Sequence, residues 1–167
     1  MFSRRTIGVL ATAAVAVGAA VAGLAPGGED LTRRHAVAER GAEVMPFSLD
    51  TTTHVFEPAA TGGTQRVIAD DRRDREQIRL IRLHLREEAT AFQRGDFADP
   101  ASIHGETMPG LEQLRAGHRR SEVRYRDLPD GARIDYETSD RSLAAAVRDW
   151  FDAQVNDHGA HAETGRR

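Results

Sequence analysis

A strict alternation of apolar and charged side chains on both sides of the turn at residues 128–131 constrains the fold most. Val123 and Tyr125 alternate with arginines before the turn, and Ile134 and Tyr136 alternate with charged residues after it. Period-two alternation around a Pro-Asp-Gly turn is typical of a β-hairpin with one buried and one solvated face. The sequence therefore predicts an antiparallel sheet that is covered on one side only.

A second hairpin is predicted upstream from β-prone runs at residues 47–57 and 65–69, which are separated by a Thr-Gly-Gly turn at 61–63. Each hairpin precedes a long segment with helical periodicity, at residues 70–95 and 139–159. We therefore expect an α+β fold in the order ββα, a short helix, then ββα. Its four-stranded antiparallel sheet should carry the two main helices on one face.

The helical segments have clear apolar faces. Pro109 can begin the short helix, which carries Leu111 and Leu114, and Trp150 lies at the centre of the apolar face of the last helix. The core stripe predicted for the first long helix is Ile78, Ile81, Leu85, Ala89 and Phe92.

The N-terminus has the pattern of an export signal. The paired Arg4 and Arg5 follow a serine and run directly into an uncharged apolar segment at residues 7–25. This arrangement predicts a twin-arginine signal, and an ordinary secretory signal is the alternative. Cleavage is expected after Ala22, and an uncleaved membrane anchor is the other possibility because the apolar run approaches the length of a bilayer span.

These features predict the following division of the chain: an export signal at 1–22, a flexible linker at 23–43, one α+β domain at 44–159 and a disordered tail at 160–167. The expected location is the periplasm or cell envelope, and the expected partner of the signal is the export translocon.

Composition excludes several functions. Removing the signal takes away two arginines and no acid, which changes the formal net charge from −3 to −5 and argues against nucleic acid as a partner. The chain has no cysteine, so it has neither disulfides nor thiolate ligands. A metal site would therefore have to use histidine, methionine and carboxylate side chains.

Polar side chains inside apolar faces are the candidates for such a site. His84 and Glu88 lie one turn apart within the apolar arc of the first long helix. A buried imidazole and carboxylate are costly unless they satisfy each other or hold a third group, so a self-contained pair is the alternative. His54 lies on one strand face with Thr52 and Phe56.

Two further segments add donors. His158 falls on the inner side of the last helix, although an imidazole at a helix C-terminus also interacts favourably with the helix dipole. A loop at 104–110 contains His104 and Met108 beside glycines, and His with Met is a ligand set suited to copper. Met108 could equally be a hydrophobic plug at a helix entrance.

We therefore expect a site for Cu or Zn around His104, with His84 and His158 as partners, Met108 as a soft ligand and Glu88 as a carboxylate that supports the ligands from behind. Binding should weaken as the pH falls through the histidine range near 6.5. No zinc-protease pattern, nucleophile elbow, P-loop or dinucleotide fingerprint occurs.

Several stretches of the predicted domain carry a resemblance to known proteins: Thr53-His54-Val55-Phe56, His84-Leu85-Arg86-Glu87-Glu88, Arg94-Gly95-Asp96-Phe97, Ile103-His104-Gly105, Met108-Pro109-Gly110-Leu111, Trp150-Phe151-Asp152-Ala153-Gln154 and Asp157-His158-Gly159. They resemble a poorly characterised family of small exported bacterial proteins that are often labelled aspartate carbamoyltransferase. Genuine transcarbamoylases are much longer and bind carbamoyl phosphate through a Ser-x-Arg-Thr loop at a helix start, which the predicted domain lacks, so that activity is the least favoured of the functions considered.

The sequence thus supports three classes of function. Histidine-based binding of a transition metal comes first, a non-catalytic module that binds an unknown protein partner in the envelope comes second, and an enzyme of the labelled kind comes third. Convergence of the candidate histidines in the fold would favour the first class, and their scattering would favour the second.

Overall fold

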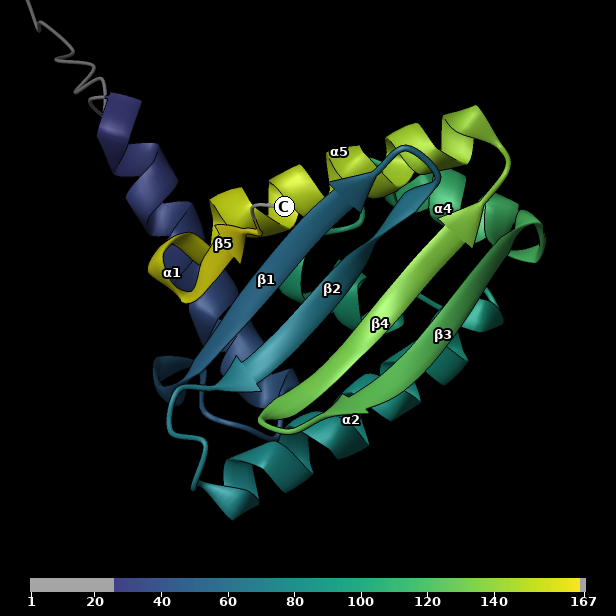
Figure 1. The fold of residues 1–167 in the computed structure, drawn as a ribbon. Coiled ribbons are helices and arrows are strands. Elements are labelled where there is room, and N and C mark those ends of the chain that lie inside the picture. Colours follow the sequence, from purple (N-terminus) through teal and green to yellow (C-terminus); the bar gives the residue numbers. More distant parts are fainter. Residues whose placement is uncertain (1–25, 166–167) are drawn as a thin grey trace, which may run out of the picture.

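The computed structural model describes residues 26–165 of the chain (Figure 1). The predicted export signal at 1–22, with Arg4 and Arg5, lies outside the described residues. Within the described part, no helix combines the length and the apolar character needed to span a membrane.

The fold is α+β and contains a five-stranded mixed sheet in the order β3-β4-β2-β1-β5. The four long strands are β1 (Thr52–Ala59), β2 (Gly62–Ala69), β3 (Ser121–Leu128) and β4 (Gly131–Thr138), and each neighbouring pair among them is antiparallel. Both predicted hairpins are therefore confirmed. The prediction of a four-stranded, purely antiparallel sheet is wrong, because β5 (Ala162–Thr164) pairs in parallel with the edge of β1.

Two long helices lie behind the sheet in Figure 1, α2 against β3 and β4 and α5 against β1 and β2. The opposite face of the sheet carries charged side chains, among them Arg66 paired with Glu57 at 3.2 Å and Arg133 paired with Asp135 at 2.8 Å. The α-helices are α1 (Pro26–Val44), α2 (Arg75–Gln93), α3 (Ala98–His104), α4 (Leu111–Gly117) and α5 (Arg141–His158), with short 3-10 turns at Leu49–Thr51, His118–Arg120 and Gly159–His161.

Aspartate caps set where the long helices begin. The Asp74 carboxylate accepts a hydrogen bond from the backbone N–H of Gln77, so α2 begins at Arg75, later than the predicted start at residue 70. The Asp140 carboxylate accepts hydrogen bonds from the backbone N–H groups of Ser142 and Leu143, as the sequence predicts for the last helix.

The core is aromatic where α2, α3 and α5 meet the sheet. The Trp150 side chain is fully buried, and its ring centre lies 5.6–5.8 Å from those of Phe92, Phe97, Tyr136 and Phe151. Edge-to-face packing of this kind stabilises an aromatic cluster beyond its area burial alone. This cluster fixes α5 against α2 and so positions His84 and Glu88 of α2 relative to His158 of α5.

The prediction of a flexible linker at 23–43 is wrong for the described part of that segment, because Pro26–Val44 form the helix α1. Val37 is fully buried, and the Arg40 guanidinium donates a hydrogen bond to the carbonyl of Ile103 at 2.7 Å. The helix packs against α3 and α5. Tertiary contacts therefore stabilise a helix whose own sequence mixes charges and small residues without a long apolar stripe.

The expected disordered tail at 160–167 is also corrected as far as residue 165, and residues 166–167 lie outside the described part of the chain. A 3-10 turn and β5 continue the chain beyond α5, and the backbone N–H of Gly165 donates to the carbonyl of Phe56 at 3.0 Å. The tail thereby covers the outer edge of β1, which would otherwise expose unpaired backbone groups.

Candidate metal centre

A small cavity of about 40 Å³ lies where α2, α3 and the end of α5 meet strands β1 and β2. It has room for only a few water-sized groups, which suits an ion better than a large organic substrate. Its lining is rich in histidine and carboxylate side chains: Met45, His54, Gln65, His84, Leu85, Glu88, Phe92, Asp99, Pro100, Ile103, His104, Gln154 and His158.

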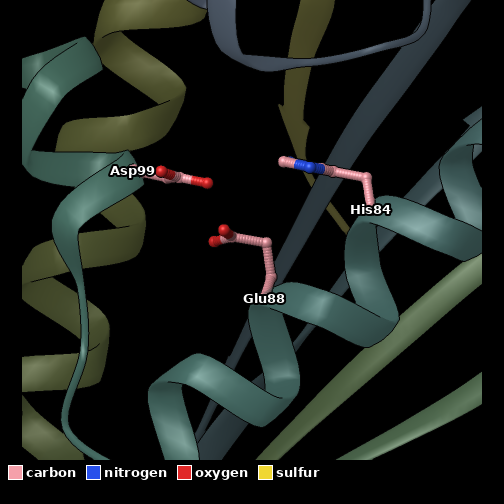
Figure 2. Close-up of side chains that lie close together, drawn as sticks. All are labelled: His84, Glu88 and Asp99. Carbon is pink, nitrogen blue, oxygen red and sulfur yellow. The ribbon is translucent and has the colours of Figure 1, made fainter.

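Three donors point toward one another in Figure 2. All three line the cavity and form its more exposed part. His84 and Glu88 come from successive turns of α2, and Asp99 comes from the first turn of α3. One ligand atom from each side chain lies within 4.8 Å of the others. We call His84, Glu88 and Asp99 the open-end triad, because Asp99 is exposed and the other two are half-buried.

The open-end triad holds a carboxyl group and an imidazole whose charged forms are both disfavoured. Burial, together with the hydrogen bond and charge of Asp99, raises the pKa of the Glu88 carboxyl to about 9. Burial lowers the pKa of the His84 imidazole below its ordinary value. Both groups are therefore biased toward their neutral forms, and a bound cation would reverse that bias for Glu88.

Three buried imidazoles line the inner end of the cavity, from β1, α3 and α5. The ring centre of His158 lies 5.0 Å from that of His54 and 4.9 Å from that of His104. We call His54, His104 and His158 the closed-end imidazoles. Burial lowers the pKa of His54 to about 3, with the neighbouring His84 and His104 contributing, and burial likewise places the pKa of His158 well below its ordinary value.

His104 is held by a carboxylate from α5. Its Nδ1 lies 2.9 Å from Asp157 Oδ2, and Arg33 of α1 binds the same carboxylate through Nε at 2.6 Å and Nη2 at 2.8 Å. Burial alone would raise the pKa of Asp157, but the hydrogen bonds from His104 and Arg33 outweigh it and lower that pKa to about 2. An ionised Asp157 only accepts, so His104 Nδ1 donates and Nε2 carries the lone pair in the neutral ring.

The structure brings most of the predicted site residues together. His84, His104, His158 and Glu88 all line this one cavity. His104 is the last residue of α3 and not part of a loop. The carboxylate of Glu88, predicted to act from behind the ligands, lies among the ligand atoms of the open-end triad.

Met108 does not join them. Its side chain is 5% exposed and belongs to the hydrophobic core, and it does not line the cavity. The methionine that does line the cavity is Met45, just after α1. The correction follows from packing, because a thioether beside a short helix is buried most cheaply among apolar neighbours.

Sequence reasoning missed Asp99 and Asp157 as members of the site. Asp99 lies in the first turn of a seven-residue helix that has no detectable periodicity, and its approach to α2 is purely tertiary. Asp157 precedes His158, and a carboxylate beside an inward-facing histidine was the available signal. His54 was singled out by strand alternation, and its burial is what that alternation predicts.

Comparison of the chain with family models, with curated proteins and with solved structures finds no match.

Proposed function

We propose that this domain binds a transition-metal ion, Zn(II) or Cu(II), at the open-end triad. The observation that carries the proposal is the convergence of one imidazole and two carboxylates within 4.8 Å at a small cavity. On binding a divalent ion, Glu88 would lose the proton that its raised pKa retains, and the carboxylates of Glu88 and Asp99 would then offset the charge of the ion.

The donor set favours a transition metal over calcium or magnesium. Calcium takes six to eight oxygen ligands and magnesium takes an octahedron of oxygens, whereas the triad offers three side chains, one of them an imidazole. Imidazole and carboxylate together suit zinc, and imidazole also suits copper. Affinity for sites of this kind rises along the first-row series toward Cu(II).

The proposed location of this metal binding is the cell envelope. Support comes from the paired arginines and the uncharged apolar run that precede the domain in the sequence. We propose a domain that takes up or holds metal outside the cytoplasm, with the export translocon as the partner of its signal.

Metal titration of the demetallated full-length chain tests the proposal. Zn(II) and Cu(II) should each bind at one equivalent to the open-end triad in competition with a chelator. A variant with His84→Gln and Glu88→Gln should bind Zn(II) at least about 100-fold more weakly, because it loses two of three ligands.

The matched control is Glu87→Gln, the same substitution on the adjacent, exposed position of α2. It should leave Zn(II) affinity unchanged, because Glu87 is not a member of the triad. Equal Zn(II) affinity for the wild type and the double variant would refute the proposal and leave the triad as a structural pair of carboxyl groups beside an imidazole.

A further inference from the structure

We propose that the cavity is a hydration centre: an ion at the open-end triad activates a water molecule, His104 accepts a proton from that water, and carbon dioxide is the substrate. This inference rests on the proposed function, because it needs a divalent ion at the triad. It extends that function from binding an ion to catalysing the reaction of a small electrophile.

The open-end triad leaves a position on the ion for water. It offers three protein ligands, and catalytic zinc sites have three protein ligands with water in the fourth position, whereas structural zinc sites are closed by four. A bound metal ion makes its water a much stronger acid and so generates a hydroxide nucleophile at neutral pH. A base that accepts the proton is the next requirement.

His104 has the arrangement of such a base. Its Nδ1 lies 2.9 Å from Asp157 Oδ2, and Arg33 holds the same carboxylate through two hydrogen bonds. Nε2 therefore carries the lone pair, and it has no hydrogen-bond partner among residues 26–165. His104 is 4% exposed and lines the cavity. An imidazole oriented by a buried carboxylate is a recurrent general base in enzymes.

The small size of the cavity brings this base close to the ion. Its volume of about 40 Å³ corresponds to roughly three or four water-sized groups. His84 and Glu88 line the cavity together with His104, so at most a short row of water molecules can separate His104 from an ion at the triad. A general base can act through one such water. The imidazolium that forms lies against the Asp157 carboxylate, which offsets its charge.

The size and the apolar part of the lining select the substrate. Leu85, Phe92 and Ile103 add apolar surface to the cavity, which suits an uncharged molecule. Beside a water on the ion, the volume leaves room for about three heavy atoms. Carbon dioxide meets both conditions, and its hydration releases no leaving group that would need further space.

Gln154 supplies a polar contact for the substrate. Its side chain lines the cavity, and the residue is 5% exposed and makes no side-chain hydrogen bond within the described part of the chain. Buried polar groups are nearly always paired, and a ligand in the cavity explains this exception. The amide N–H can donate to the substrate oxygen that gains negative charge, as side-chain amides do in oxyanion holes.

The reaction balances in atoms and charge. Water on the ion gives a proton to His104 Nε2, and the hydroxide oxygen forms a bond to the carbon of carbon dioxide. The electron pair of one C=O bond moves to the oxygen beside Gln154, which yields bicarbonate, and a new water displaces this product from the ion. His104 returns its proton to the buffer through the open end, where Asp99 is exposed, and no oxidation or reduction takes place.

The test measures carbon dioxide hydration by the full-length chain loaded with one equivalent of Zn(II), in a stopped-flow assay with a pH indicator. The loaded chain should hydrate carbon dioxide faster than free Zn(II) or the apo chain. His104→Gln should lower kcat about 100-fold, with Zn(II) affinity unchanged, because general-base catalysis contributes roughly 10²–10⁴-fold.

Asp157 is a positioning residue, and its variant separates catalysis from packing. In Asp157→Asn the side-chain amide can donate to His104 Nδ1 and so moves the ring proton to Nε2. This variant should lower kcat at least about tenfold with KM unchanged, because the ring then holds the wrong tautomer. It also carries the test if His104→Gln does not fold. The control His35→Gln removes an exposed imidazole on α1 and should leave hydration unchanged.

A second measurement does not depend on turnover. Addition of bicarbonate to the Co(II)-substituted full-length chain should change the visible absorption of the cobalt. Gln154→Leu should weaken this bicarbonate binding about tenfold, as expected for the loss of one hydrogen bond, and should leave Co(II) affinity unchanged. Bicarbonate binding of equal strength in both proteins would remove Gln154 from the centre and overturn its assigned contact.

The outcomes separate this proposal from the proposed function. A wild-type chain that binds one equivalent of Zn(II) but hydrates carbon dioxide no faster than free Zn(II) overturns the hydration centre and leaves the proposed function standing. A folded His104→Gln variant with full kcat does the same. Failure of the wild type to bind Zn(II) refutes the proposed function instead.

Discussion

The affinity of the open-end triad for Zn(II) should rise steeply between pH 7 and pH 9. A pKa of about 9 for Glu88 means that its carboxyl group carries a proton in nearly all apo molecules at pH 7. Zinc must displace that proton, which weakens binding at pH 7 by roughly 100-fold relative to a fully ionised site, or about tenfold for each pH unit below 9. Zn(II) affinity therefore rises with pH, because the proton and the metal compete for the Glu88 carboxylate.

Calorimetry and chelator competition measure this effect. Titrations of Zn(II) at pH 7 in buffers with different ionisation enthalpies should report about one proton released per ion bound. Apparent affinity should climb toward pH 9 and then level off. His84 has a lowered pKa and adds little above pH 7, so the slope belongs to Glu88 and not to the histidine range expected from the sequence. Zinc affinity that stays constant from pH 7 to pH 9, with no proton release, would refute this reasoning.

Four other outcomes are expected. Because its folded-state pKa is raised, Glu88 should make the apo domain less stable as pH rises from about 4.5 toward 9, and Glu88→Gln should remove that slope in urea denaturation. Trp150→Ala should cost about 3–5 kcal/mol of unfolding free energy, because the side chain is fully buried in the aromatic cluster. A thermal midpoint near that of the wild type would contradict this packing. Arg33→Ala should lower the free energy of unfolding by about 1–2 kcal/mol, because it removes the half-exposed bidentate partner of the buried Asp157 carboxylate. Unchanged stability would show that α1 docks without this ion pair. Replacing Arg4 and Arg5 by lysine should block export through a twin-arginine route, which cell fractionation would detect. Normal export of that variant would point to the ordinary secretory route.

Local patterns in the sequence were sufficient for the hairpins and the long helices. The alternation around residues 128–131 predicts β3 and β4, and the aspartate at 140 marks the start of α5. These signals are encoded by near neighbours, since turn chemistry and helix capping act over a few residues. The start of α2 was placed too early because several aspartates in succession could each cap a helix, and only Asp74 has the geometry to do so.

Elements that depend on distant contacts were not predictable in the same way. α1 is stabilised by contacts such as that of Arg33 with Asp157, which is 124 residues away in the chain. β5 has only three residues and exists because β1 offers it a parallel partner. Neither segment has enough periodicity of its own to indicate a structure.

The candidate site shows the same division. His84 and Glu88 could be paired from the sequence because residues four apart on a helix share a face. The meeting of their helix with Asp99 and with the closed-end imidazoles depends on how α2, α3 and α5 pack around the aromatic core. Met108 was misassigned because residue type alone does not tell a ligand from a core side chain.

The most direct test of the account is a crystal structure of the zinc-loaded protein with anomalous data at the zinc edge. The account predicts a peak between His84, Glu88 and Asp99, with bonds of about 2.0–2.2 Å to one nitrogen and to carboxylate oxygens. An anomalous map with no peak between these three side chains, or with zinc only on exposed surface residues, would contradict it.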